Sequence, residues 1–258
     1  MILEVSGLAR HFGGIRALDG VDLRIGRGEL VGIIGPNGSG KTTLFNVITG
    51  IYRPDRGGVS MEGRSIVGLP PHRIARLGIA RTFQNIRLFR DLTVIDNVRI
   101  AHHRHIGYGP TAALLRTGSF YREERRTRDE VEVFLSIFSL QERRNELAKN
   151  LSYGEQRKLE IARALASRPK LLLLDEPAAG MNPFEVGRLM EFLMEIRARF
   201  SLTVLLIEHQ MRLAMGISER LIVLDFGQVI ACGAPGEIQK DPRVIEAYLG
   251  QGASPGLS

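Results

Sequence analysis

One stretch constrains this chain most: a short apolar run, a glycine-rich loop and an apolar helical pattern follow one another directly. Leu30–Ile34 is apolar and rich in branched residues, which predicts a buried strand. Residues 35–42 read G-P-N-G-S-G-K-T and fit the G-x-x-x-x-G-K-[S/T] pattern of a phosphate-binding loop. From Lys41 onward, apolar residues recur at helical spacing. Strand, loop and helix in this order are the context that the pattern requires.

The residue types of this loop suit dense negative charge. Gly35, Gly38 and Gly40 have no side chains, so backbone N–H groups can curve closely around phosphate oxygens. The helix that begins here adds the partial positive charge of its N-terminus. Lys41 can bring a full charge to the β- and γ-phosphates, and the Thr42 hydroxyl can reach Mg²⁺. The predicted nucleotide contacts in the loop are Gly35, Pro36, Asn37, Gly38, Ser39, Gly40, Lys41, Thr42 and Thr43.

Length and composition favour one large intracellular α/β domain. The 258 residues, 44% of them hydrophobic, suffice for such a domain with a smaller one appended. No apolar run approaches the ~20 residues of a membrane span, and the N-terminus does not resemble a signal peptide. The single cysteine, Cys232, cannot form an intramolecular disulfide, which suits a reducing cytoplasm. The net charge of +7 is scattered, so its densest run, 122–128, is interpreted as a solvated helix face rather than a nucleic-acid surface.

Alternating patterns before the phosphate loop predict an antiparallel β layer. Ile2–Phe12 and Val21–Ile25 read as strands joined by a loop through Gly13 and Gly14. Phe12 could stack on a purine ring, although the residues alone favour a half-buried strand aromatic. Further strands are expected at Gly57–Glu62, Ile79–Phe83, Leu171–Leu174, Leu202–Ile207, Arg220–Asp225 and Gln228–Cys232. Further helices are expected at Pro71–Leu77 and Pro183–Phe200, and two short helices are expected before about Leu249.

Strand patterns stop between about Thr93 and Asn150, where the sequence predicts an inserted helical subdomain. Helical spacing of apolar residues indicates one helix near residues 94–100 and a longer one over Ser119–Leu140. A histidine cluster at His102, His103 and His105 invites a metal interpretation. Nothing else in the chain supplies a matching cluster, so a solvated or interfacial segment is favoured.

A second helix start that could face an anion lies at residues 151–156, which read L-S-Y-G-E-Q. Ser152 is a favourable N-cap, and Glu155 three residues later completes a capping box. An apolar helix follows. The capping box by itself favours an ordinary, well-capped helix.

Polar side chains follow several predicted strands directly. Asp175 and Glu176 end a continuous apolar run, where two adjacent carboxylates are hard to explain by packing. Asp175 suits a contact with Mg²⁺, and Glu176 suits a general base that activates a water. Gln84 could offer an amide oxygen to Mg²⁺, and His209 could reach a γ-phosphate.

Taken together, these motifs resemble the nucleotide-binding subunit of an ABC transporter over nearly the whole chain. In that family's terms, residues 35–42 are the phosphate loop, residues 151–156 the signature, residues 171–175 the Walker B strand and residues 179–182 the D-loop. Four single residues also match: Phe12 is the aromatic of the A-loop, Gln84 is the glutamine of the Q-loop, Glu176 is the catalytic glutamate and His209 is the switch histidine. The order of phosphate loop and signature is very specific. The individual glutamine and histidine positions are not.

Within that family, the sequence is most similar to the larger ATPase subunit of branched-chain amino acid importers. Residues 81–89, 175–183 and 207–211 carry this likeness, as does the long insertion after Gln84. Asn182 stands where the D-loop usually carries aspartate, and the resembled subgroup commonly has asparagine there. Tyr153 replaces the glycine of many signatures, which should be tolerated because Gly154 keeps its backbone accessible.

The resemblance implies a P-loop NTPase fold and its cofactors. The fold is α/β, with a mostly parallel core sheet, an antiparallel β layer and an inserted α-helical subdomain. One ABC ATPase domain covers 1–258: residues 1–90 and 155–258 form the core, and 91–154 form the subdomain. ATP and Mg²⁺ are implied, with Thr42, Gln84 and Asp175 near the metal and with Lys41, Gln84, Glu176 and His209 as catalytic residues.

The resemblance also implies partners. Each monomer would hold ATP on its own loop, and a facing ATPase subunit, a paralogue or a second copy, would complete the site with Ser152, Gly154 and Glu155. The helical subdomain and Ile86–Phe89 would contact membrane permease subunits, and a periplasmic or extracellular binding protein would act indirectly. The subunit would sit peripherally on the cytoplasmic face of the inner membrane.

Two alternatives remain open from the sequence. The first is an ATPase of another ABC system, such as lipopolysaccharide export, because the cargo is chosen by other subunits. The second is an ABC protein without a transporter, acting on DNA or ribosomes. This chain has one set of motifs and no sustained heptads, which disfavours the second alternative and any nucleic-acid partner.

Overall fold

The structure, a computed structural model, describes residues 1–102 and 114–249. The chain divides into two compact units: Met1–Arg81 with Lys170–Ser258, and Thr82–Pro169. The second unit contains all of the 91–154 segment that the sequence predicts as a helical subdomain, and extends beyond it on both sides. The break falls directly before the segment that carries Gln84.

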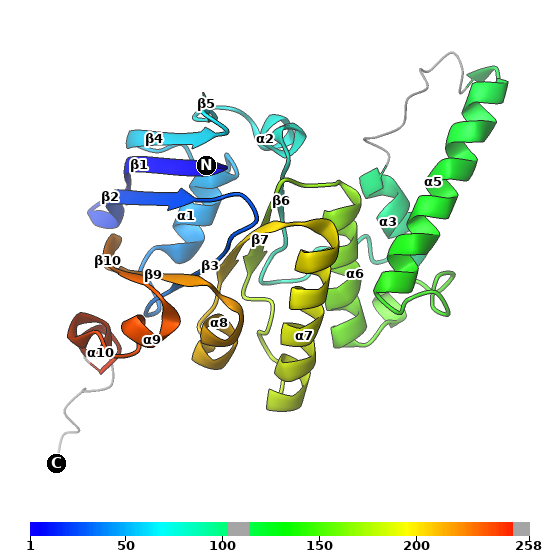
Figure 1. Cartoon of the computed structure of the whole chain (residues 1–258). Helices are drawn as coiled ribbons and strands as arrows, with labels where there is room; N and C mark the ends of the chain where they lie inside the picture. The colour runs from blue at the N-terminus through cyan, green and yellow to red at the C-terminus, as the bar shows by residue number, and fades with distance from the viewer. Residues whose placement is uncertain (103–113, 250–258) are drawn as a thin grey trace. The chain divides into compact units, whose positions relative to one another are not determined.

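A six-stranded sheet forms the centre of the first unit, in the order β10-β9-β3-β8-β7-β6 (Figure 1). All neighbouring strands are parallel except the pair β9 and β10. Every residue of β3, β7 and β8 is buried, as expected for apolar strands covered on both faces. The strands are β3 Leu30–Ile34, β6 Ile79–Arg81, β7 Leu171–Asp175, β8 Thr203–Ile207, β9 Arg220–Asp225 and β10 Gln228–Gly233.

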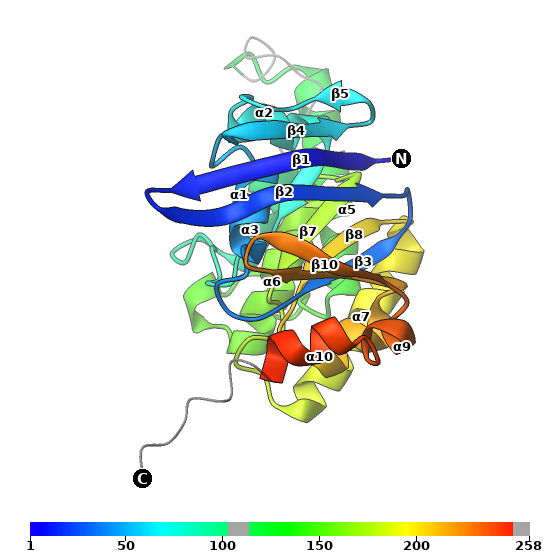
Figure 2. The ribbon, with the colours of Figure 1, turned by 90° about the vertical axis from the view of Figure 1, so that its left-hand side faces the viewer.

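A four-stranded antiparallel sheet, ordered β2-β1-β4-β5, forms the predicted β layer (Figure 2). Its strands are β1 Leu3–Phe12, β2 Ile15–Ile25, β4 Arg56–Met61 and β5 Arg64–Ser65. The prediction that the second strand begins at Val21 is wrong. Phe12 pairs with Ile15, so a two-residue turn with Gly13 at φ 57° closes a hairpin at once, as such turns do.

The main apolar core of the first unit joins both sheets to the helix that follows the phosphate loop. That helix is α1, Lys41–Ile48, whose Leu44, Phe45 and Ile48 are fully buried. They pack with residues of β1, β2 and β4 and of β3, β7, β8 and β9. A smaller core joins β3 and β9 to three later helices. The remaining helices of this unit are α2 Pro71–Leu77, α7 Pro183–Phe200, α8 Met211–Ile217, α9 Pro235–Ile238 and α10 Pro242–Leu249.

The described part of the second unit is helical, and the helices predicted there are present. They are α3 Val94–His102, α5 Gly118–Ile137, the 3₁₀ turn η2 Ala148–Asn150 and α6 Tyr153–Ala166. α5 ends before the predicted Leu140, because Ser139 takes a left-handed φ of 55°. Throughout the described residues, no helix has both the length and the apolar character needed to cross a membrane. The expected α/β fold with a mostly parallel sheet, an antiparallel layer and a helical part is confirmed.

Candidate functional site

Two glycines of the phosphate loop are required by how tightly the loop packs. Gly35 has a φ of 147°, and a Cβ added there would lie 2.0 Å from the Leu224 carbonyl oxygen. Gly40 has a φ of 103°, and its Cβ would lie 2.3 Å from the Ala17 carbonyl oxygen. A Cβ on Gly38 would meet no atom within 4 Å. The loop is therefore anchored at both ends by close backbone approach, while its middle faces open space in which a ligand can lie.

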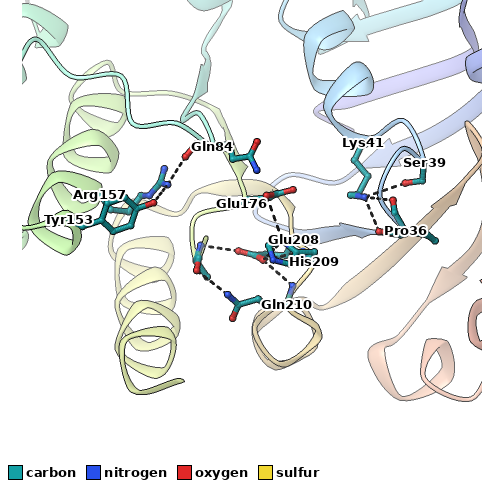
Figure 3. A network of polar contacts seen from close by, with 12 residues as sticks. Pro36, Ser39, Lys41, Gln84, Tyr153, Arg157, Glu176, Glu208, His209 and Gln210 are labelled. Carbon is teal, nitrogen blue, oxygen red and sulfur yellow. Dashed lines mark hydrogen bonds and ion pairs between the residues drawn. The ribbon is translucent and has the colours of Figure 1, made fainter. Parts of the chain in front are cut away.

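Lys41 holds its ammonium group inside this loop (Figure 3). Its Nζ donates to the carbonyl oxygens of Gly35 at 2.8 Å and Pro36 at 2.7 Å, and lies 3.3 Å from Ser39 Oγ. Burial lowers the pKa of Lys41, and the negative charges of Glu176 and Asp175 oppose that shift. The lysine thus lies within electrostatic reach of both carboxylates. Among the other predicted loop contacts, Asn37 and Thr42 are exposed and Thr43 is half-buried.

Three neighbouring parallel strands place the other predicted residues of this unit at one sheet edge. Asp175 at the end of β7 pairs with Ile207 at the end of β8, and Ile207 pairs with Ile33 near the end of β3. Glu176 directly follows β7, and the phosphate loop directly follows β3. His209 follows β8 after one intervening residue. The carboxyl ends of these strands therefore gather a lysine, two carboxylates and an imidazole beside one loop.

Glu176 and His209 face each other at this edge. His209 Nδ1 lies 3.6 Å from Glu176 Oε2, and the Glu176 N–H donates to the Ile207 carbonyl oxygen at 2.9 Å. Glu176 takes a φ of 46°, which is uncommon for a residue with a side chain. Backbone strain of this kind persists where the surroundings hold it, often at functional sites. Glu176 thus combines this backbone conformation with a side chain that lies beside the imidazole.

Glu208 is a further residue of this region that the sequence interpretation missed. Its carboxylate is fully buried and accepts the backbone N–H of Ala178 at 3.0 Å, of His209 at 3.1 Å and of Gln210 at 3.2 Å (Figure 3). The Gln210 side chain donates back to the Ala178 carbonyl oxygen at 3.0 Å. Glu208 thereby ties the residue directly before the predicted D-loop to the segment that carries His209. Its position directly after a buried strand, like that of Glu176, was the available signal.

Replacing Glu208 by alanine should lower the free energy of unfolding by about 2–4 kcal/mol, because buried amide groups lose their acceptor. Glutamine keeps one acceptor oxygen but turns the other into an NH₂ donor that faces a backbone N–H, so Glu208→Gln should cost less than the alanine change but still destabilise the protein. Burial raises the pKa of Glu208 above 4.5. A raised pKa means that the wild type should lose stability relative to Glu208→Gln as pH rises above 4.5. Urea unfolding across this pH range measures both effects, and equal losses for Ala and Gln would contradict the assignment.

Ser152 and Glu155, at the start of α6 in the second unit, form the predicted capping box. Glu155 N–H donates to Ser152 Oγ at 3.4 Å, and Ser152 N–H donates to Glu155 Oε2 at 2.9 Å. Ser152 is exposed, and a Cβ on Gly154 would meet no atom within 4 Å. This helix start is therefore well ordered by its own side chains and open to an approaching group.

Arg157, also missed from the sequence, holds the segment that carries Gln84 (Figure 3). Its fully buried guanidinium donates to the carbonyl oxygens of Phe83 at 2.8 Å and Gln84 at 2.9 Å, and to Tyr153 Oη at 3.1 Å. Glu160 pairs with it at 2.8 Å and also accepts the Phe83 N–H. The backbone around Gln84 is thus fixed to α6, while the Gln84 residue is exposed. An arginine and a glutamate three apart on an apolar helix were the available signal.

Phe12 is the last residue of β1 and is 38% exposed. Its ring meets Tyr52 edge to face at 5.2 Å between centroids, and the Arg10 guanidinium carbon lies 4.8 Å from the ring centroid. An exposed aromatic platform beside a cation is compatible with base stacking. Its contact with a purine remains a prediction.

His102 is buried and its imidazole contacts the Glu130 carboxylate. The solvated half of the expectation is therefore wrong for this residue, and the interfacial half stays a prediction. His103 and His105 lie outside the described residues. Within residues 1–102 and 114–249, no group of three or more His, Cys, Asp or Glu side chains could hold a metal ion. A His–Glu pair on two packed helices explains His102 as part of the core of the second unit.

Comparisons with known proteins show the family of this chain. The ABC transporter family model matches residues 18–179, and that of the branched-chain amino acid ATP-binding cassette transporter matches residues 228–254. The high-affinity branched-chain amino acid transport ATP-binding protein BraF of Pseudomonas aeruginosa is 47% identical, over 97% of this chain and 98% of the relative.

Two solved structures extend the comparison. The ADP conformation of MJ1267, an ATP-binding cassette of an ABC transporter, matches 96% of this chain and 98% of its own at 34% identity, with a TM-score of 0.82. The dimeric structure of MJ0796, a bacterial ABC transporter cassette, matches 91% of this chain and 99% of its own at 26% identity, with a TM-score of 0.77. The nucleotide-binding ATPase fold and the sequence likeness therefore agree over almost the whole chain, and this protein belongs to the ATP-binding proteins of the ABC transporter family, among the relatives of the branched-chain amino acid transport ATPases.

Proposed function

We propose that this protein hydrolyses ATP to drive an ABC importer for branched-chain amino acids. One observation carries the chemistry: the ends of β3, β7 and β8 bring Lys41, Glu176 and His209 to one sheet edge. Lys41 would move from the loop carbonyls to the β- and γ-phosphates. Glu176 would take a proton from the attacking water, and His209 would orient Glu176 and contact the γ-phosphate.

The oxygen donors of the same edge fit Mg²⁺. Thr42 offers an exposed hydroxyl at the start of α1, and Asp175 offers a carboxylate at the end of β7. Hard oxygen ligands of this kind suit Mg²⁺. When bound, the ion would neutralise charge on the β- and γ-phosphates. We propose Thr42 and Asp175 as its protein contacts.

We further propose that two such subunits complete the site by pairing head to tail. A monomer offers its phosphate loop and, separately, the capped start of α6 with Ser152, Gly154 and Glu155. Both are helix starts suited to anions, and Gly154 leaves room for close approach. The likeness to the dimeric cassette MJ0796 supports this arrangement. The facing subunit would be a paralogue or a second copy of this chain.

Replacing Ser152 by arginine should leave ATP binding by the monomer intact and raise the dissociation constant of the ATP-dependent dimer by an order of magnitude or more. The large side chain would fill the space that a facing γ-phosphate needs, and the cap would be lost. Ser152→Ala is the matched control, since it loses the same cap, worth about 1 kcal/mol, without added bulk. Both Ser152 variants are made in the Glu176→Gln background, so that ATP is not consumed during the experiment. Sedimentation with ATP then measures the fraction of dimer. Full dimerisation of the arginine variant would rule out the facing-site arrangement.

The cargo is proposed from the family evidence. The family model that matches residues 228–254 and the relative BraF both carry branched-chain amino acid transport in their descriptions, which favours this cargo over lipopolysaccharide export. The exposed ring of Phe89, near the start of the second unit, offers a patch within residues 86–89 for permease subunits. We place the subunit at the cytoplasmic face of the membrane, with an external binding protein delivering the cargo.

Uptake by reconstituted vesicles tests the proposal. The protein is combined with the permease and binding protein of a branched-chain amino acid importer, and entry of leucine, isoleucine and valine is measured with ATP inside the vesicles. Uptake should require ATP and should stop with Glu176→Gln. ATP hydrolysis without uptake of these amino acids would refute the cargo. Normal uptake with Glu176→Gln would refute the energetic role.

A further inference from the structure

Arg81, the last residue of β6, reaches the carboxylate proposed to bind the metal. Its Nη2 donates to Asp175 Oδ2 at 2.7 Å. The two side chains are 6% and 4% exposed, so this is a buried ion pair. β6 lies beside β7 with Arg81 opposite Leu173, which brings the arginine near the carboxyl end of β7. The sequence interpretation assigned no role to Arg81.

The same guanidinium also contacts the helix that begins at the phosphate loop. Its Nη1 donates to Asn46 Oδ1 at 2.7 Å and to Thr49 Oγ1 at 3.2 Å. Its central carbon lies 5.4 Å from the centroid of the Phe45 ring. The planar fork of an arginine can serve two directions at once, whereas a lysine acts as a point charge. Arg81 therefore joins the Asp175 carboxylate to α1 through one rigid group.

A buried carboxylate needs a positive partner, because an unpaired buried charge is strongly unfavourable. Asp175 receives that charge from Arg81. A divalent cation drawn to Asp175 would act on the same carboxylate and would compete with the guanidinium. A fixed internal cation should thus orient Asp175 while weakening its attraction for a second cation.

We infer that Arg81 is a positioning residue of the ATPase site, which holds Asp175 in place against α1 and moderates the affinity of that carboxylate for Mg²⁺. This inference rests on the proposed function, because it assumes that Asp175 contacts the Mg²⁺ of bound nucleotide. It differs from a purely structural role in one measurable way. Removing Arg81 should change how strongly nucleotide binding depends on Mg²⁺.

Calorimetry with the non-hydrolysable analogue AMP-PNP measures this dependence on the full chain. The measured quantity is the ratio of the dissociation constant in EDTA to that in excess Mg²⁺. In Arg81→Met this ratio should rise about tenfold over wild type, because one competing charge is removed. Arg81→Lys keeps the charge and should stay near the wild-type ratio. Arg73→Met, on the exposed face of α2, is the matched surface control and should not change it.

The double variant Arg81→Met/Asp175→Asn separates the two roles. It removes both members of the buried pair, so the increase in the Mg²⁺ ratio should vanish. Without nucleotide, Arg81→Met should lower the melting temperature by about 5–15 °C, and the double variant should recover part of that loss. If Arg81→Met does not fold, Arg81→Gln and the double variant decide the question by the same ratio.

Two results would overturn the inference. The first is an Arg81→Met ratio within twofold of wild type. The second is a rise that persists when Asp175 is also replaced, since Asp175 would then not be the carboxylate involved. Failure of the proposed function looks different: the wild-type protein itself would not bind AMP-PNP in either condition.

Discussion

Replacing Glu176 by glutamine should slow ATP hydrolysis by roughly 10²–10⁴-fold while ATP binding stays within a few-fold of wild type. Glutamine has nearly the same shape as glutamate, but its amide cannot take a proton from water. The backbone of residue 176 should keep its place, because its N–H still donates to the Ile207 carbonyl oxygen. Phosphate release at saturating MgATP measures the rate, and calorimetry measures the binding.

The design of the control matters because Glu176 also lies 3.6 Å from His209. Losing this contact alone is expected to cost little, since the imidazole is half exposed. Glu191→Gln, at an exposed position of α7, removes the same charge outside the predicted site residues and should hydrolyse ATP at the wild-type rate. Hydrolysis by Glu176→Gln within threefold of that control would show that another group is the base. The Glu176→Gln dimer should persist in ATP, because the γ-phosphate stays in place.

Much of the site edge could be predicted because it depends on local sequence and on one rule of sheet geometry. The apolar runs before the phosphate loop and before Asp175 predict buried strands, and both are buried at every position. Parallel strands present their carboxyl ends at one edge, so residues that follow such runs meet in space. Neither the strand order nor the register was needed to group Lys41 with Glu176. Ser152 and its capping box could also be predicted, because two residues three positions apart define it.

The missed residues act over long separations in the chain, where local patterns carry no information. Arg81 meets Asp175 across 94 positions, and Arg157 meets the Phe83 carbonyl across 74. Each is one arginine among many, and only the fold selects its partner. Glu208 is different, because its place directly after β8 matched the reasoning already used for Glu176. The early start of β2 was missed because exposed side chains after the turn hide the alternation that marks a strand.

Replacing Lys41 by alanine should weaken ATP binding by about 10²-fold, the effect expected from losing charge-assisted hydrogen bonds to two phosphates. Lys41 is already dehydrated, since its ammonium is buried and bonded to the Gly35 and Pro36 carbonyl oxygens. Moving it to a phosphate therefore exchanges neutral acceptors for charged ones without stripping bulk water from the amine. That exchange favours the nucleotide complex, which is why the loss should appear as affinity.

The same contacts predict a second consequence that distinguishes Lys41 from a surface lysine. Alanine leaves the two loop carbonyl groups without their donor, so the loop should become less ordered even before nucleotide arrives. Hydrogen exchange at residues 35–40 should therefore increase in Lys41→Ala and stay unchanged in Lys240→Ala, an exposed lysine of the same unit. Calorimetry with ATP supplies the affinities. Unchanged ATP binding in Lys41→Ala would contradict the phosphate-loop assignment. Weak ATP binding with unchanged hydrogen exchange at residues 35–40 would show that Lys41 contacts the nucleotide but does not order the loop.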